Sequence, residues 1–426
     1  MPQFVGASPG SRRGGNRCES TSSATTNRCG RMTHEHVTFA VLSDLHAAPR
    51  SSDPKGTEVK LYSDGDNFGQ HDSPLSSLYE LVTRESLTAD FVICPGDMTN
   101  RADGGALRFV WEQLHVLKQK MGGQEVIATV GNHDVDSRGH TEGTIPREAL
   151  MRLLPRFPIA DDALADHFWA HGYFLTTIGR VRFLVLNSSW LHEHRNELER
   201  GAVTGYTLEK LQRDLDGQRE AEFNVAVCHH HPHVHSELNL GGDIMLNGQK
   251  LLDTLSSNGA WLVIHGHKHH PKIELAQGEF QQPIVLACGS FSGRLEGANA
   301  TVSRNYFHVV QVERFGVDAE LRGVVKSWNW VQGYGWKEYG NSNVTFPSRL
   351  GFGFEGSVQQ LARAIVNSMG THQLMKWEAM LKLQPDLAHL TPRKLNALSS
   401  TLDTKHNIVI TCDGTGLPFE FGVRSV

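Results

Sequence analysis

Short runs of apolar, often β-branched residues alternate along the chain with longer segments in which apolar residues recur at helical spacing. The short runs predict buried strands, and the longer segments predict amphipathic helices. Strands that end in a polar cluster are expected at Val37 to Ser43, Phe91 to Cys94, Val126 to Val130, Val225 to Cys228 and Trp261 to Ile264. Helices are expected at Leu75 to Leu87, Ala106 to Lys120, Leu208 to Leu215 and Gln249 to Leu255. This alternation predicts an α/β fold with largely buried sheets.

The sequence patterns at the two ends of the chain differ from this alternation of strands and helices. Residues 1–31 are rich in Ser, Thr, Arg and Gly without periodicity, so we expect a disordered segment, with translation starting at Met1 or Met32. Further strands are expected at Val181 to Leu186, Ile284 to Ala287, Phe307 to Val312 and Ala319 to Val324. Beyond them, helical patterns at 356–381 and 392–400 and a strand at 408–411 predict a C-terminal α+β appendage, residues 326–426, of unknown role.

Composition narrows the class of protein. The formal net charge is −5 and the pI is near 6.6, unlike the basic footprint of a nucleic-acid-binding domain, so we expect a small substrate and no nucleic-acid partner. The six cysteines form no C-x-x-C pair, which favours reduced thiols and a cytoplasmic location. No apolar run is long enough to span a bilayer, so no membrane partner is expected. The N-terminal residues contain no apolar h-region, so we do not expect them to act as a secretory signal. The oligomeric state stays open.

Polar clusters follow the predicted strands, and many of the 24 histidines lie in them. In open α/β sheets, ligands bind beyond the carboxyl ends of the strands, so these side chains should meet. Carboxylate and imidazole groups suit divalent Mn, Fe or Zn ions, and a carboxylate with two oxygens can bridge two of them. Within Asp44/His46 and His267/His269, the i, i+2 spacing puts both side chains on one face of an extended segment. The candidate metal ligands are Asp44, His46, Asp97, Asn132, His230, His267 and His269.

The order of these clusters resembles the calcineurin-like metallophosphoesterase superfamily. The matching motifs are D-L-H at 44–46, G-D at 96–97, G-N-H-D at 131–134, H-H-P at 230–232 and G-H-K-H at 266–269. Each motif alone is common, since a single Asp or Asn after a strand is usually a turn residue. The resemblance implies a four-layer α-β-β-α sandwich of two mixed sheets with flanking helices, spanning residues 32–325. The sequence around Asp97 and Pro232 is most similar to bacterial cyclic-nucleotide and glycerophosphodiester phosphodiesterases.

The resemblance also implies a role for each position. Asp97 would bridge two metal ions, His133 would protonate the leaving group, and Asp134 would orient the His133 ring. The first ion would be held by Asp44, His46 and His269, and the second by Asn132, His230 and His267. Because His229, His230 and His231 are consecutive, the choice between His229 and His230 stays open.

The implied activity is hydrolysis of phosphoesters by a hydroxide that bridges two divalent or mixed-valence ions of Mn, Fe or Zn. We expect a phosphodiesterase that acts on small diesters or cyclic nucleotides. A metal-dependent nuclease or a phosphomonoesterase of the same superfamily is the alternative, and a non-catalytic protein-binding scaffold is a minor one. The residues G-D-M-T-N-R-A at 96–102 depart from the G-D-x-V-D-R-G motif of the superfamily's protein phosphatases, which argues against that activity.

Overall fold

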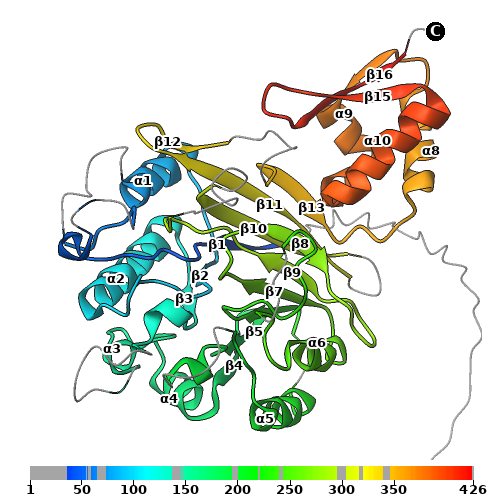
Figure 1. The fold of residues 1–426 in the computed structure, drawn as a ribbon. Helices are drawn as coiled ribbons and strands as arrows, with labels where there is room; N and C mark the ends of the chain where they lie inside the picture. Colours follow the sequence, from blue (N-terminus) through cyan, green and yellow to red (C-terminus); the bar gives the residue numbers. More distant parts are fainter. Residues whose placement is uncertain are drawn as a thin grey trace, which may run out of the picture. The chain divides into compact units, whose positions relative to one another are not determined.

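The computed structural model describes residues 36–53, 55, 59–64, 73–136, 145, 147–193, 200–218, 221–238, 243–294, 304–315, 320–338 and 346–424. The predicted disordered segment, residues 1–31, lies outside this description. Two mixed sheets and their flanking helices form the larger part of the described chain (Figure 1). No described helix combines the length and the apolar character that a membrane span requires.

The first sheet contains the strands that precede the first three polar clusters. Strands β1, β2 and β3 are parallel neighbours, and β10 and β11 extend the sheet in antiparallel fashion beyond β1. The sheet order is β12-β11-β10-β1-β2-β3, with β13 also paired to β11. The strands are β1 (His36–Val41), β2 (Phe91–Cys94), β3 (Glu125–Ala128), β10 (Tyr306–Phe315), β11 (Glu320–Val331), β12 (Gly335–Lys337) and β13 (Arg349–Phe352).

The second sheet contains the strands that precede the two histidine clusters. Its central strands β5, β6, β7 and β9 are parallel, and the edge strands β4 and β8 are antiparallel to their neighbours. The order is β4-β5-β6-β7-β9-β8. The strands are β4 (Tyr173–Ile178), β5 (Val181–Leu186), β6 (Phe223–Val227), β7 (Trp261–His265), β8 (Lys272–Leu275) and β9 (Ile284–Ala287).

The two sheets pack face to face through aromatic side chains. Phe183 of β5 meets Phe39 of β1 and Phe91 of β2 edge-on, with ring centroids 6.2 Å and 4.8 Å away. All three rings are buried, so they hold the sheets at a fixed separation. This packing brings the carboxyl ends of both parallel strand sets to one edge of the sandwich. There, Ser43 after β1 bridges to Ser290 after β9.

Helices cover the outer faces, as amphipathic patterns predict. Helix α2 contacts β2 and β3, and α1 contacts β12. An Asp103 cap and a left-handed Gly122 bound α2. Helices α5 and α6 pack their apolar faces into a cluster with the outer side of the second sheet. The helices are α1 (Pro74–Glu85), α2 (Gly104–Met121), α3 (Glu148–Met151), α4 (Asp162–His171), α5 (Gly205–Asp216) and α6 (Gly248–Ser256).

The C-terminal part has its own small core. A sheet of order β14-β16-β15 packs with three helices around buried residues such as Leu398 and Phe421. The elements are α8 (Val358–Met369), β14 (Leu374–Lys376), α9 (Trp377–Leu383), the 3₁₀ helix η4 (Pro385–His389), α10 (Pro392–His406), β15 (Ile408–Cys412) and β16 (Pro418–Val423).

The predicted α/β sandwich is confirmed, while several boundaries move. The predicted domain boundary at 325/326 falls inside β11, and residues up to Phe352 pair with the first sheet. The predicted helical segment 356–381 is broken into α8, β14 and α9. Helix α4 and strand β4 were not predicted.

Candidate metal centre

Candidate ligands from both sheets meet at the shared edge of the sandwich. Asp44 and His46 follow β1, and Asp97 follows β2. The short 3₁₀ helix η2 (Asn132–Asp134) follows β3 and carries Asn132. The histidines come from the second sheet, with His229 and His230 after β6 and His267 and His269 after β7. Histidine and acidic side chains from these segments form overlapping groups whose ligand atoms lie within 4.8 Å of one another.

The first group is centred on Asp44. His46 Nε2 and His269 Nε2 lie 3.0 Å apart, and His269 Nε2 is 3.3 Å from Asp44 Oδ1. The same oxygen is 3.9 Å from His46 Nε2. Two nitrogens and an oxygen therefore converge on one point.

The second group is centred on Asn132. The side-chain oxygen Oδ1 of Asn132 is 3.1 Å from His229 Nε2 and 3.1 Å from His267 Nδ1. His229 Nε2 is in turn 3.3 Å from Asp97 Oδ2. The oxygen and both nitrogens converge on a second point.

Asp97 lies between the two groups. Its Oδ2 is 3.7 Å from His46 Nε2 in the first group and 3.3 Å from His229 Nε2 in the second. Its other oxygen accepts a hydrogen bond from the backbone N–H of His133 at 2.8 Å, which fixes the carboxylate plane. The geometry leaves Oδ2 available to both groups at once.

Hydrogen bonds distinguish His229 from His230. His229 Nδ1 faces the Pro95 carbonyl at 2.8 Å, so Nδ1 carries a proton and Nε2 is the nitrogen that faces Asp97 and Asn132. The hydroxyl oxygen of Ser188 accepts the backbone N–H groups of both His229 and His230, so its own proton is free for His230 Nδ1 at 2.9 Å. His230 Nε2 is buried without a hydrogen-bond partner, and His230 belongs with His229 and His267 to one group whose ligand atoms lie within 4.8 Å of one another. Of the two histidines, His229 is the one whose Nε2 contacts both Asn132 and Asp97.

Several of the candidate ligands have a strained backbone conformation. Asp44, His46, Asp97, His267 and His269 have φ between +49° and +86°, a left-handed conformation that few non-glycine residues adopt. Such strain concentrates at functional sites, where the surrounding structure enforces it.

Gly131 lets the first and second groups approach closely. A Cβ on Gly131 would lie 2.0 Å from Asp97 Oδ1 and 2.2 Å from Asp97 N. Any side chain at this position would therefore displace the carboxylate that lies between the two groups.

His133 borders the first group. Its ring centroid is 4.8 Å from that of His46, and its Nδ1 lies 2.7 Å from the Asn100 carbonyl. The Asn100 carbonyl therefore holds the imidazole, where we had expected the Asp134 carboxylate. Asp134 instead accepts the backbone N–H groups of Thr99 and Gly131, both at 2.9 Å. Its burial, followed by the nearby Asp97 charge, raises its pKa to about 7.

The donor set fits metal ions. With metal–ligand distances of about 2.1 Å, ligands at right angles are roughly 3.0 Å apart, and tetrahedral ones roughly 3.4 Å. Most donor separations in both groups match these values. Burial alone would lower the pKa of His229, but the Asp97 and Asp44 carboxylates raise it to about 9. The buried negative charge of these carboxylates thus favours a proton on His229, at the position where a bound metal ion would neutralise that charge.

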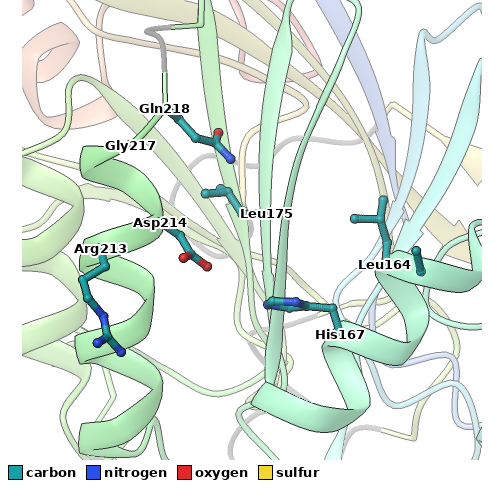
Figure 2. Close-up of a pocket in the computed structure, with 8 residues that line it drawn as sticks. Leu164, His167, Leu175, Arg213, Asp214, Gly217 and Gln218 are labelled. Carbon is teal, nitrogen blue, oxygen red and sulfur yellow. The ribbon is translucent and has the colours of Figure 1, made fainter.

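A groove away from this edge has different chemistry. It has a volume of about 520 Å³ between α4, β4 and α5, and Figure 2 shows Asp214 and His167 among its lining side chains. Asp214 is already paired with Tyr173 and Lys210. None of the candidate ligands lines this groove.

Comparisons with known proteins agree with the motifs. The model of the calcineurin-like phosphoesterase family matches residues 37–271. A second family model, wHTH-Calcineurin_assc, matches residues 350–404. A search of curated proteins finds no match.

Two similar solved structures are a cold-active protein-tyrosine phosphatase of a psychrophile, Shewanella sp., and a point mutant of a cold-active protein tyrosine phosphatase. The first is 14% identical, with a TM-score of 0.25, and the alignment covers 68% of this chain and 77% of that chain. The second is 15% identical, with a TM-score of 0.25, and covers 67% and 77%. The family match spans more than half of the 426 residues. The chain therefore belongs to the calcineurin-like phosphoesterase family.

Proposed function

We propose that this metal-dependent phosphoester hydrolase is a phosphodiesterase with a dinuclear centre, acting on small diesters such as cyclic nucleotides. The observation that carries the dinuclear assignment is the position of Asp97 Oδ2, within 3.7 Å of one donor group and 3.3 Å of the other. A single carboxylate oxygen between two sets of imidazoles suits a shared ligand of two ions.

The proposed ligands follow the two groups. Asp44, His46 and His269 would hold the first ion, Asn132, His229 and His267 would hold the second, and Asp97 would serve both. His229 replaces His230, which the sequence had favoured, because His229 Nε2 lies 3.1 Å from Asn132 Oδ1 and 3.3 Å from Asp97 Oδ2. Imidazole and carboxylate donors suit Mn, Fe or Zn.

When bound, the two ions supply positive charge beside the phosphoryl oxygens and make a water molecule acidic enough to act as a nucleophile. The chain itself supplies the proton for the leaving oxygen. With Nδ1 of His133 turned to the Asn100 carbonyl, its Nε2 is the nitrogen available to a substrate. We propose His133 as the general acid. Asp134 acts indirectly, by joining the backbone segments that carry Asp97 and Asn132.

Charge around the centre supports a diester over a monoester. The segment 231–242 contains no Lys or Arg, and in the segment 53–72 five acidic residues outnumber two lysines. Lys268, next to two proposed ligands, is paired with Asp243. These segments offer few positive side chains to neutralise the second negative charge of a dianionic monoester. A singly charged diester needs less neutralising charge.

The test compares kcat/KM for bis-p-nitrophenyl phosphate and p-nitrophenyl phosphate with the same metal and pH. We expect the diester to be preferred. A clear preference for the monoester would refute the diesterase assignment while leaving the metal centre intact.

A nuclease is the second candidate, favoured by the C-terminal match to a winged helix-turn-helix model. Helices of such domains can read DNA grooves. The exposed face of α10 carries Arg393, Asn396, Ser400 and Thr404, which are hydrogen-bonding side chains at helical spacing. Hydrolysis of DNA, without hydrolysis of small diesters, would favour this candidate.

A further inference from the structure

Asp243 contacts the metal centre from a segment that carries no family motif. Its carboxylate oxygens lie 3.1 and 3.2 Å from His267 Nε2, and one of them also contacts Lys268 Nζ. Its side chain is 16% exposed, so water competes only weakly for these bonds. The segment is anchored two residues later, where Met245 N–H donates to the His231 carbonyl at 2.9 Å and the Met245 side chain is buried.

The carboxylate determines which nitrogen of His267 carries the proton. Lys268 Nζ contacts the same carboxylate, and this positive charge favours its ionised form. An ionised carboxylate only accepts hydrogen bonds, so His267 Nε2 must hold the proton. The lone pair then resides on Nδ1, which lies 3.1 Å from Asn132 Oδ1 inside the second group.

The same arrangement with a weaker acceptor occurs at His229, whose Nδ1 is fixed by the Pro95 carbonyl. A carboxylate donates more electron density through the ring than a neutral carbonyl, so His267 becomes the more basic ligand. Lys268 partly neutralises Asp243 at the same time, which keeps the proton on the imidazole.

We propose that Asp243 is a positioning residue that fixes the Nε2–H tautomer of His267 and thereby strengthens metal binding at the second group. The first group of Asp44, His46 and His269 receives no such support from Asp243. This inference rests on the metal centre of the proposed function, but it concerns metal binding and is independent of the substrate.

The chain offers a matched control. Glu237 makes the same kind of contact outside the centre, with Oε2 3.0 Å from His270 Nε2 and Oε1 2.7 Å from Lys272 Nζ. Glu237→Gln therefore removes a carboxylate from a histidine and a lysine without touching a proposed ligand.

The experiment titrates Mn²⁺ into the metal-free full-length chain by calorimetry. Wild-type protein should bind two ions. Asp243→Ala should weaken one binding step about 10- to 100-fold, the range found for lost outer-shell partners. The weakened step should be the one that His229→Ala abolishes. The other step, which His46→Ala abolishes, should keep its wild-type affinity in Asp243→Ala. Asp243→Asn should lose less metal affinity, because its amide oxygen can still accept the hydrogen bond from His267 Nε2–H. Glu237→Gln should bind like wild type, and the metal-free proteins should melt at the same temperature.

Three results would overturn the inference: wild-type affinities for both ions in Asp243→Ala, equal weakening of both steps, or uptake of fewer than two ions by the wild type. A lower melting temperature of metal-free Asp243→Ala would assign the residue a structural role instead. A wild-type chain that binds two ions but hydrolyses no phosphoester would refute the proposed function and leave the role of Asp243 standing.

Discussion

Replacing His133 with alanine removes the proposed proton donor and should keep both metal groups. Its ring makes one hydrogen bond, to the Asn100 carbonyl, and its backbone N–H, which holds Asp97, is retained in the variant. General acids contribute about 10²- to 10⁴-fold to rate. Since each tenfold corresponds to about 1.4 kcal/mol, the barrier should rise by about 3 to 5.5 kcal/mol for a substrate with a poor leaving group.

The loss should depend on the leaving group. A cyclic nucleotide expels an alkoxide that needs a proton, whereas p-nitrophenolate departs with little help. We expect the full loss of kcat for the first substrate and at most about a tenfold loss for bis-p-nitrophenyl phosphate. The assay measures kcat on both substrates together with metal content, with the exposed His372→Ala as a control. Equal losses on both substrates, or loss of metal from His133→Ala, would refute the reasoning.

Three further predictions concern the ligands and stability. Asp97→Ala should lower bound Mn²⁺ below two ions per chain and abolish turnover; an unchanged stoichiometry by elemental analysis would contradict a shared ligand. His229→Ala should lose one ion while His230→Ala keeps both, and the reverse result in the same measurement would restore the sequence-based choice. At Glu313, a hydrogen bond from His389 lowers the pKa to about 2 despite burial. A lowered carboxyl pKa stabilises the folded state above the unfolded value, so the free energy of unfolding should fall as pH drops from about 4.5 toward 2. Glu313→Gln should flatten that fall in urea titrations, and an identical pH profile would contradict the role of this contact.

The catalytic sandwich could be predicted because its central strands are short, fully buried and followed by polar residues. The run Phe91–Cys94 was predicted to its exact bounds, since both faces of a parallel strand are covered and the pattern is continuously apolar. Strand β4 lies at a sheet edge with mixed burial, so its pattern was not recognised. The helical prediction at 356–381 missed the interruption after Gly370, where a short exposed strand pairs with β16.

The site was predictable in its location and not in its details. Motif spacing indicated the strand ends that carry the candidate ligands, but the choice between His229 and His230 depends on the contact of His229 with Asn132, 97 residues earlier in the chain. Asp243 likewise reaches His267 across 24 residues of sequence. Such contacts arise from tertiary packing, and no local sequence pattern predicts them. Asn100, whose carbonyl holds His133, contributes only its backbone, so its side-chain identity gave no signal.

The left-handed backbone at the candidate metal centre implies a conflict between the stability of the chain and its ability to bind metal. Each such residue costs about 1 to 2 kcal/mol relative to glycine, which adopts this conformation freely. His46 and His269 carry bulky rings at these positions, at φ of 49° and 57°. Selection for thermal stability alone, acting on a metal-free chain, would favour glycine there and erase the ligands. The imidazoles at these positions therefore lower the stability of the metal-free chain, and laboratory evolution for heat resistance without a catalytic screen should remove them first.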